Sequence, residues 1–200
     1  HTYNKNEQIT FVEEYLTKRC IKYTKNVNNN TTVIRWVKNN IIPIKYSDLY
    51  DENQEKIIHP KYMNLPINKV KYVLKGVIKS DGCIRKEISL EMTSRKVVES
   101  IRYICIRMGI LTSGYIRDRI GETHQSGDKT FTCKKKSYVL RIPQNEEICG
   151  LFDINFDNHK YQNFFRYQNL LCSRITNIET EFYEGCLYDL EMCDEHNYLT

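Results

Sequence analysis

One short segment of this 200-residue chain combines a helix-packing surface with a carboxylate at its end. The segment runs Leu74-Lys75-Gly76-Val77-Ile78-Lys79-Ser80-Asp81-Gly82. Because Gly76 has no side chain, a second helix can approach the backbone closely there, with Val77 beside it. Asp81 follows at the C-terminal end of this seam. A partner helix of the same design would place a second carboxylate nearby, and two carboxylates suit a hard cation such as Mg²⁺.

Two such cations about 3.5–4 Å apart can activate a water and stabilise the leaving oxygen of a phosphodiester. The alternative interpretation is ordinary amphipathic packing, which is the commoner role of a helix that ends in Asp-Gly. The spacing predicts a helix from Asn68 to about Ser80, with Gly82 just past its end as a left-handed stop. The apolar face of this helix comprises Val70, Val73, Leu74, Val77 and Ile78.

Charge is distributed unevenly along the chain. Residues 61–143 contain eighteen Lys or Arg and seven Asp or Glu, a net charge of +11. Residues 144–200 contain three and eleven, a net charge of −8. A strongly basic domain is the electrostatic footprint of a protein that binds a polyanion. We therefore expect two functional units with a boundary within 144–172, the alternative being a solvated charged surface.

The apolar periodicity from residue 68 onwards predicts the order helix, strand, helix, strand, strand, helix. The first strand covers 84–92, where apolar and polar residues alternate and give the strand one polar face. The second helix begins at Thr93 or Ser94 and ends at Gly109. The remaining elements are two strands and a short helix, around 114–120, 131–142 and 144–152.

The two ends of the chain show weaker patterns. Thr10 and Glu13 form a capping box, which predicts the start of a helix. The β-branched run over 31–37 predicts a strand, and residues 43–66, which contain three prolines, are expected to be irregular. From Ser173 onwards, short apolar runs predict a small all-β piece.

The eight cysteines show no metal-binding spacing, since the closest pair is seven residues apart and a zinc site needs tighter pairs. We expect reduced thiols and an intracellular, reducing compartment. The sequence has neither a signal-peptide pattern nor an apolar run of the about 20 residues that a membrane-spanning helix needs. We therefore expect no membrane partner.

The segment 74–82 resembles the LAGLIDADG motif of homing endonucleases. Leu74, Gly76, Asp81 and Gly82 match the motif, Val77 and Ile78 are conservative, and Lys79 stands where the family often has a second acid. The lead-in 58–63 and the strand-then-helix run 88–110 are also similar to the family. The resemblance implies an α+β fold with antiparallel DNA-binding sheets and the motif helix at a pseudo-twofold interface. Residues 1–58 would be the remainder of the first half and 59–165 the second half.

The resemblance also implies roles for individual residues. Asp81 would be the catalytic metal ligand for Mg²⁺, and Lys136 the lysine that tunes the attacking water. Leu74, Gly76, Val77 and Gly82 would form the helix interface. For Lys136, as for Lys134 and Lys135, phosphate contact or simple solvation remains the alternative. Residues expected to contact double-stranded DNA are Arg85, Glu87, Ser89, Glu91, Arg117, Arg119, Lys134 and Lys135.

The tail carries a second resemblance. Residues 183–199 are similar to the penultimate splicing block of inteins, with Asp189 and His196 at its two polar functional positions. This implies a truncated Hint-type splicing domain over 166–200. The chain begins with His1, has no early Thr-x-x-His block and stops before a terminal His-Asn pair, so this chain alone is not expected to splice.

Taken together, the two resemblances predict an intein-encoded homing endonuclease that makes Mg²⁺-dependent double-strand breaks at a long DNA site. The second acid would come from the missing N-terminal segment or from a second copy of the chain. The main alternative is a non-cleaving relative that binds DNA or RNA, such as a degenerate endonuclease or an intron maturase. A third alternative is an unrelated α+β interaction protein.

Overall fold

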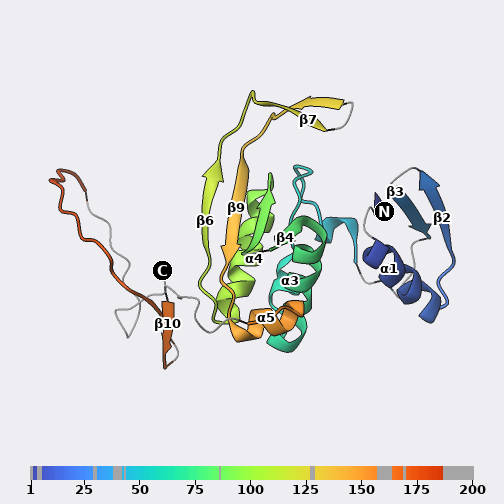
Figure 1. Cartoon of the computed structure of the whole chain (residues 1–200), viewed down its shortest axis with the longest axis horizontal. Helices are drawn as coiled ribbons and strands as arrows, with labels where there is room; N and C mark the ends of the chain where they lie inside the picture. The colour runs from blue at the N-terminus through green and yellow to red at the C-terminus, as the bar shows by residue number, and fades with distance from the viewer. Residues whose placement is uncertain are drawn as a thin grey trace.

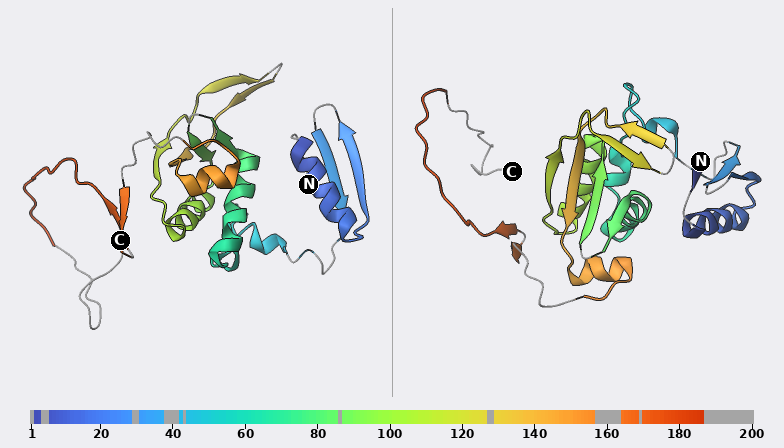
Figure 2. Two further views of the ribbon diagram at one scale, coloured as in Figure 1. Left: turned by 60° about the horizontal axis from the view of Figure 1, so that its bottom comes forward. Right: turned by 45° about the horizontal axis from the view of Figure 1, so that its top comes forward.

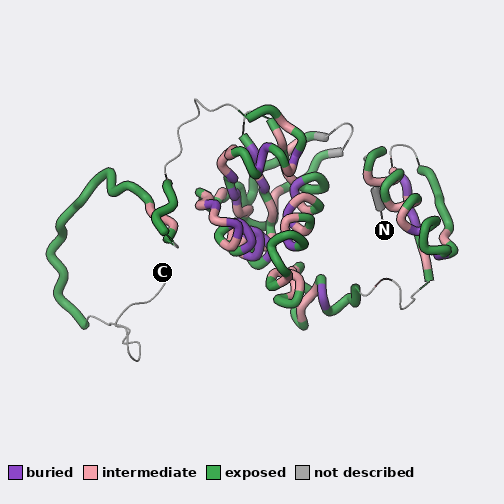
Figure 3. Tube along the Cα trace, turned by 90° about the horizontal axis from the view of Figure 1, so that it is seen from below, coloured by how far each residue is buried: buried purple, intermediate pink, exposed green. Residues whose placement is uncertain are grey.

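The computed structural model describes residues 2–3, 6–28, 31–37, 42, 44–85, 87–126, 129–156, 164–168 and 170–186. These residues form an N-terminal unit, a central α+β unit and a C-terminal hairpin (Figure 1). Figure 3 shows that most buried positions lie in the central unit, whereas residues 173–186 are exposed. None of the helices in the described ranges is long and apolar enough to cross a membrane.

The N-terminal unit packs one helix on a small antiparallel sheet. Helix α1 (Asn6–Lys18) covers the strands β1 (Thr2–Tyr3), β2 (Tyr23–Asn28) and β3 (Thr31–Trp36), in the order β1-β3-β2. Its core comprises Leu16, Ile21 and Ile34. Strand β3 confirms the prediction for residues 31–37. The predicted capping box at Thr10 is wrong, because Ile9 already packs against the core and the helix begins at Asn6.

A buried carboxylate organises the segment that leads into the central unit. Asp48, at the end of the 3₁₀ turn η1 (Tyr46–Asp48), is 3% exposed. Its carboxylate accepts hydrogen bonds from the Lys45 N–H at 2.8 Å and the Tyr62 hydroxyl at 2.9 Å, and it pairs with Lys61 Nζ at 2.6 Å. These donors, the Lys45 N–H foremost, lower the pKa of Asp48 to about 2. Tyr62 and Lys61 belong to α2 (Pro60–Met63), so Asp48 fixes this short helix to the segment before it.

The central unit is a four-stranded antiparallel sheet with two helices on one face. Its elements are α3 (Ile67–Asp81), β4 (Gly82–Ile84), β5 (Ile88–Met92), α4 (Arg95–Arg107), β6 (Ser113–Arg117), β7 (Thr123–Ser126), β8 (Lys129–Thr132), β9 (Ser137–Ile142) and α5 (Glu146–Phe152). The strand order is β4-β5-β9-β6, and β7 pairs only with β8 in a separate ribbon that projects beyond β6 and β9 (Figure 1).

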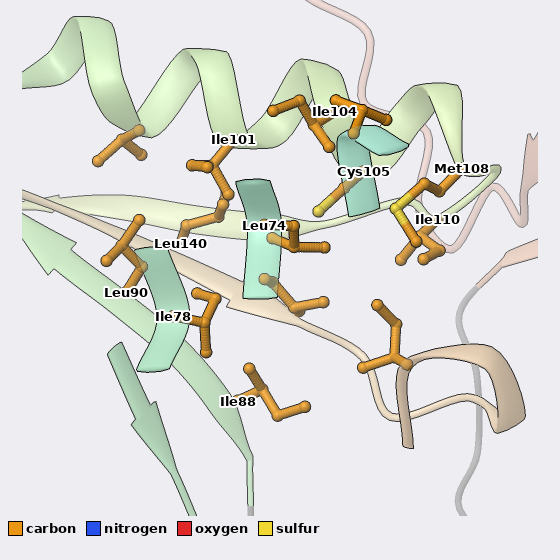
Figure 4. Packing of buried hydrophobic residues seen from close by; sticks show 14 of the residues in the cluster. Leu74, Ile78, Ile88, Leu90, Ile101, Ile104, Cys105, Met108, Ile110 and Leu140 are labelled. Carbon is orange, nitrogen blue, oxygen red and sulfur yellow. The ribbon is translucent and has the colours of Figure 1, made fainter. Parts of the chain in front are cut away.

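Apolar residues from both helices and from one face of the sheet form the core. Leu74 and Ile78 of α3 lie against Ile88 and Leu90 of β5, and Ile101 of α4 closes the cluster (Figure 4). Because strand residues alternate between faces, Ile88, Leu90, Leu140 and Ile142 point to the helices, and their neighbours point outward. Figure 2 gives two further views of the two helices and the sheet.

Two predicted strands are each divided in the structure. The predicted strand 84–92 is a hairpin, because β4 and β5 pair antiparallel and the Arg85 N–H donates to the Glu87 carbonyl at 3.1 Å. The predicted strand 131–142 is interrupted at 133–136, and β7 lies between the two strands predicted around 114–120 and 131–142. The helices were better predicted: Ser94 caps α4, and Gly109 lies just beyond it with φ 71°.

Gly82 corrects a further prediction, since it has an extended backbone with φ −87° and ψ 174°. Glycine is needed there for space rather than for a left-handed conformation. A Cβ atom at position 82 would lie 2.6 Å from the carbonyl oxygen and 2.9 Å from the Cα of Ile78. The helix therefore passes into β4 without an intervening loop.

The C-terminal hairpin comprises β10 (Phe164–Tyr167) and β11 (Leu170–Ser173). Arg166 donates to the carbonyls of Met108 and Gly109, which fixes the hairpin to the C-terminal end of α4. Residues 174–186 contain neither helix nor strand, contrary to the prediction of short strands there. Their apolar side chains find no surface to pack on, as the 91% exposure of Phe182 illustrates. Asp189 and His196 lie outside the described residues.

Candidate nucleic-acid interface

The end of α3 presents a carboxylate at the edge of the sheet. Asp81 is the last residue of α3, and Gly82 is the first residue of β4. The Asp81 side chain is exposed, and its Oδ2 accepts a hydrogen bond from the Ser80 hydroxyl at 2.9 Å. The position of the acid is therefore set by the helix, which is fixed in turn by Leu74 and Ile78 in the core.

The four residues predicted for the helix interface do not share one face. Leu74 is fully buried in this chain's own core, and Gly82 contacts Ile78. Gly76 is exposed, and a Cβ built there would meet no atom within 4 Å. Val77 is half-buried beside it. A second helix could therefore approach α3 on the side of Gly76, as the predicted helix-packing surface requires. Leu74, by contrast, packs within this chain.

Asp81 supplies one oxygen donor group, and the described residues add few others. No three His, Cys, Asp or Glu side chains in the described ranges are grouped so that they could hold a metal ion. Mg²⁺ usually takes one or two carboxylates and keeps several waters or phosphate oxygens. The chain therefore fits one part of a cation site that another carboxylate would complete. A hollow of about 530 Å³ lies between α1 and α3, lined by Asn6, Glu7, Ile78, Lys79, Gly82 and Ile84, and Asp81 is not among its lining residues.

The sheet face opposite the helices is polar. Ser89 and Glu91 of β5 lie on it, as predicted, while Arg85 and Glu87 lie in the β4–β5 turn. Arg117 is the last residue of β6, and Arg119 follows it in the segment leading to the ribbon. Arg141, which was not predicted from the sequence, lies opposite both Ser89 and Ser113 in the sheet. The signal was present, because Arg141 stands between the apolar Leu140 and Ile142.

Arginines and carboxylates are paired across this face. Arg117 Nη1 lies 2.5 Å from Glu91 Oε2, and its Nη2 donates to the Tyr115 hydroxyl. Arg141 Nε lies 3.5 Å from Glu87 Oε1. The hydrogen bond to Tyr115, together with the charge of Glu91, raises the pKa of Arg117. The centre of the face is thus ordered in the free protein.

The lysine cluster, residues 134–136, lies in the segment between β8 and β9. Lys134 and Lys135 are exposed and have no carboxylate partner in the described part of the chain. Lys136 Nζ pairs with Asp118 Oδ2 at 2.8 Å and thereby lowers the pKa of Asp118. Lys136 leads into β9, two strands across the sheet from β4. The structure therefore does not bring Lys136 beside Asp81.

The order α3-β4-β5-α4-β6-β9-α5, with both large helices on one face of an antiparallel sheet, defines a fold that is shared with a homing endonuclease. A variant of I-DmoI, in complex with its target DNA and in the presence of manganese, superposes with a TM-score of 0.50 and 12% identity, covering 76% of this chain and 75% of that chain. Mesophilic variants of the homing endonuclease I-DmoI give a TM-score of 0.49 and 13% identity, with 74% and 69% of the two chains covered.

One curated protein shares part of its sequence with the chain. The ATP-dependent DNA helicase Hel308 of Methanocaldococcus jannaschii is 37% identical over 86 residues, which cover 40% of this chain and 7% of the helicase. The chain therefore spans only a small part of that relative's length. No protein-family model matches the chain.

Proposed function

We propose that the chain is part of a LAGLIDADG homing endonuclease that binds double-stranded DNA on the polar face of the β4-β5-β9-β6 sheet and cleaves it with Mg²⁺. The observation that carries this proposal is the direct passage from α3 to β4, which places the exposed carboxylate of Asp81 at the edge of that face. An acid at the edge of a DNA-binding surface is where a cation must be held to reach a phosphodiester. The fold shared with I-DmoI and the net charge of +11 over residues 61–143 support the proposal.

The residues of the chain divide into acid and binding groups. Asp81 would hold one side of a divalent cation, which when bound supplies water activation and stabilisation of the leaving oxygen. Lys134 and Lys135 would bind phosphates as point charges, and Arg117 and Arg141 would face the base edges. Lys136 would be the catalytic lysine only if its Nζ left Asp118, with which it is paired in the structure.

The proposed site is completed from outside this chain. A second carboxylate would come from the motif helix of the first half or from a second copy, approaching α3 on the side of Gly76. The openness around Gly76 supports this arrangement. The isolated chain is therefore expected to bind DNA but to cleave it poorly.

We further propose that the endonuclease is part of an intein, with residues 166–200 as a C-terminal part of its Hint-type splicing domain. The resemblance of residues 183–199 to a splicing block supports this, with Asp189 and His196 assisting splicing. A match that stops after 86 residues within a helicase also suits an inserted element. Sequencing the flanking coding region tests the proposal: a first LAGLIDADG motif upstream and a terminal His-Asn downstream are expected, and an uninterrupted unrelated domain on both sides would contradict it.

Duplex binding at several salt concentrations tests the proposed DNA-binding function. Each phosphate contact releases counterions, so the affinity for a 30-bp duplex should fall steeply between about 50 and 200 mM salt. Competition with a folded intron RNA separates the endonuclease from a maturase, because a maturase would prefer the RNA. A chain that does not bind duplex DNA, or binds it independently of salt, would refute the proposal.

A further inference from the structure

Five side chains form a continuous ladder across the polar face of the sheet. In spatial order they are Glu91, Arg117, Tyr115, Arg141 and Glu87. The two guanidinium carbons lie 5.4 Å and 5.3 Å from the centre of the Tyr115 ring. This spacing is within the range of cation–π attraction. The ladder covers Val139, which lies between Glu91 and Tyr115 in register and is only 6% exposed.

Glu91 connects three strands of the sheet. Its Oε2 lies 2.5 Å from Nη1 of Arg117 on β6, and its Oε1 accepts a hydrogen bond from the Ser137 hydroxyl on β9 at 2.6 Å. Arg117 uses its second terminal nitrogen on the Tyr115 hydroxyl. Both oxygens of the carboxylate and both terminal nitrogens of the guanidinium are therefore engaged before any ligand binds.

The ladder has no net charge, although the domain that carries it is strongly basic. Two arginines are matched by two glutamates at the centre of the face, whereas Lys134 and Lys135 beside the ribbon have no carboxylate partner within the described residues. Non-specific affinity for DNA comes from cations that meet phosphates. The cations that are available for phosphate contacts therefore lie at the border of the polar face, whereas the arginines of the ladder are neutralised by glutamates.

We infer that Glu91 is a specificity-determining residue, which keeps Arg117 from binding phosphate and reserves it for a base edge. The inference rests on the proposed DNA-binding function. A phosphate that bound Arg117 would meet the carboxylate of Glu91, and like charges at that distance repel. Guanine O6 and N7 are uncharged acceptors that can use the remaining N–H groups of Arg117, and a cytosine amino group can donate to Glu91.

Replacement of Glu91 by Gln tests the inference. We would measure the affinity of the wild type and of Glu91→Gln for a random-sequence 30-bp duplex by fluorescence anisotropy between 50 and 300 mM salt. Because the variant frees Arg117, it should bind about two- to fivefold more tightly at low salt. The slope of log affinity against log salt should steepen by about 0.9, as expected for one added phosphate contact. Selection from a random library should give a weaker sequence consensus for the variant than for the wild type, because an arginine on phosphate reads no base.

Two controls separate this mechanism from a simple change of charge. Glu147→Gln on α5 removes the same charge from an exposed position away from the sheet and should leave affinity and slope unchanged. In an Arg117→Gln background, Glu91→Gln should have no effect on the slope, because there is no arginine to free. Thermal unfolding of each variant by circular dichroism shows that the sheet is intact.

The outcomes are distinct. If Glu91→Gln behaves as Glu147→Gln does, or if its effect persists in the Arg117→Gln background, the inference is wrong while the proposed DNA-binding function stands. If the wild type shows no salt-dependent binding to duplex DNA, the proposed function itself fails. A variant that binds more tightly only when Arg117 is present, with a steeper salt slope, supports the inference.

Discussion

The two glycines of the motif should respond in opposite directions to the same substitution. Gly76 lies inside α3 and is exposed, with no atom within 4 Å of an added Cβ. Gly82 begins β4, and its Cβ would lie 2.6 Å from the Ile78 carbonyl oxygen. Gly76→Ala therefore adds helix propensity without a clash, whereas Gly82→Ala forces backbone atoms apart.

The magnitudes follow from general values for such changes. Alanine is about 0.8–1 kcal/mol more favourable than glycine inside a helix, so Gly76→Ala should stabilise the isolated chain by roughly that amount. Overpacking typically costs about 1–3 kcal/mol, and the atoms that Gly82→Ala meets first are backbone atoms that cannot rotate away. For a domain of about 60–100 residues, 1 kcal/mol shifts the Tm by about 4–8 °C. The two variants should thus differ in Tm by at least about 7 °C.

Thermal unfolding followed by circular dichroism, with urea titration as a second measure, makes the comparison directly. A Gly82→Ala variant as stable as the wild type would show that the passage from α3 to β4 is not as close as the structure has it. A destabilised Gly76→Ala variant would mean that the isolated chain already packs something against α3. In the proposed endonuclease with a partner helix, by contrast, a methyl group at position 76 would meet that helix and should lower cleavage.

Two further predictions concern the ends of the central unit. Arg166→Met removes the donors to the Met108 and Gly109 carbonyls. The rate of amide hydrogen exchange in β10 and β11 should therefore rise about tenfold. An unchanged rate would show that the hairpin is held by other contacts. The pKa of Asp48 is lowered to about 2 in the folded protein. Its ionised carboxylate therefore stabilises the fold fully above about pH 4 and progressively less as the pH falls towards 2. The difference in urea midpoint between the wild type and Asp48→Asn should therefore close over that window, and a constant difference from pH 5 to pH 2 would contradict the assignment.

The sequence predicted the helices better than the turns, for a physical reason. The buried stripe of Leu74 and Ile78 repeats at helical spacing and needs no knowledge of the partner surface. The β4–β5 turn, by contrast, contains neither Gly nor Pro, so nothing in residues 84–88 marks it. The ribbon β7–β8 was hidden because its residues are largely polar and its base is held by backbone hydrogen bonds, such as Gly121 N–H to the Cys133 carbonyl at 2.9 Å.

The candidate site was only partly accessible from sequence. Asp81 could be proposed from the sequence because a local motif places it at a helix end, where the structure has it. The pairing of Glu91 with Arg117 and Ser137 depends on the strand order β5-β9-β6, which brings together residues from three separated segments. Such an arrangement is a property of the sheet as a whole, and composition and spacing show only that charged residues are present.

The central claim is that Asp81 holds a divalent cation beside bound DNA, and paramagnetic broadening by Mn²⁺ tests it most directly. Oxygen ligands suit Mn²⁺ as they suit Mg²⁺, and fast exchange makes weak binding visible. With duplex DNA present, trace Mn²⁺ should broaden the amide signals of residues 80–83 in the wild type and in the control Asp153→Asn, but not in Asp81→Asn. Equal broadening in all three proteins, or none in the wild type, would contradict the account.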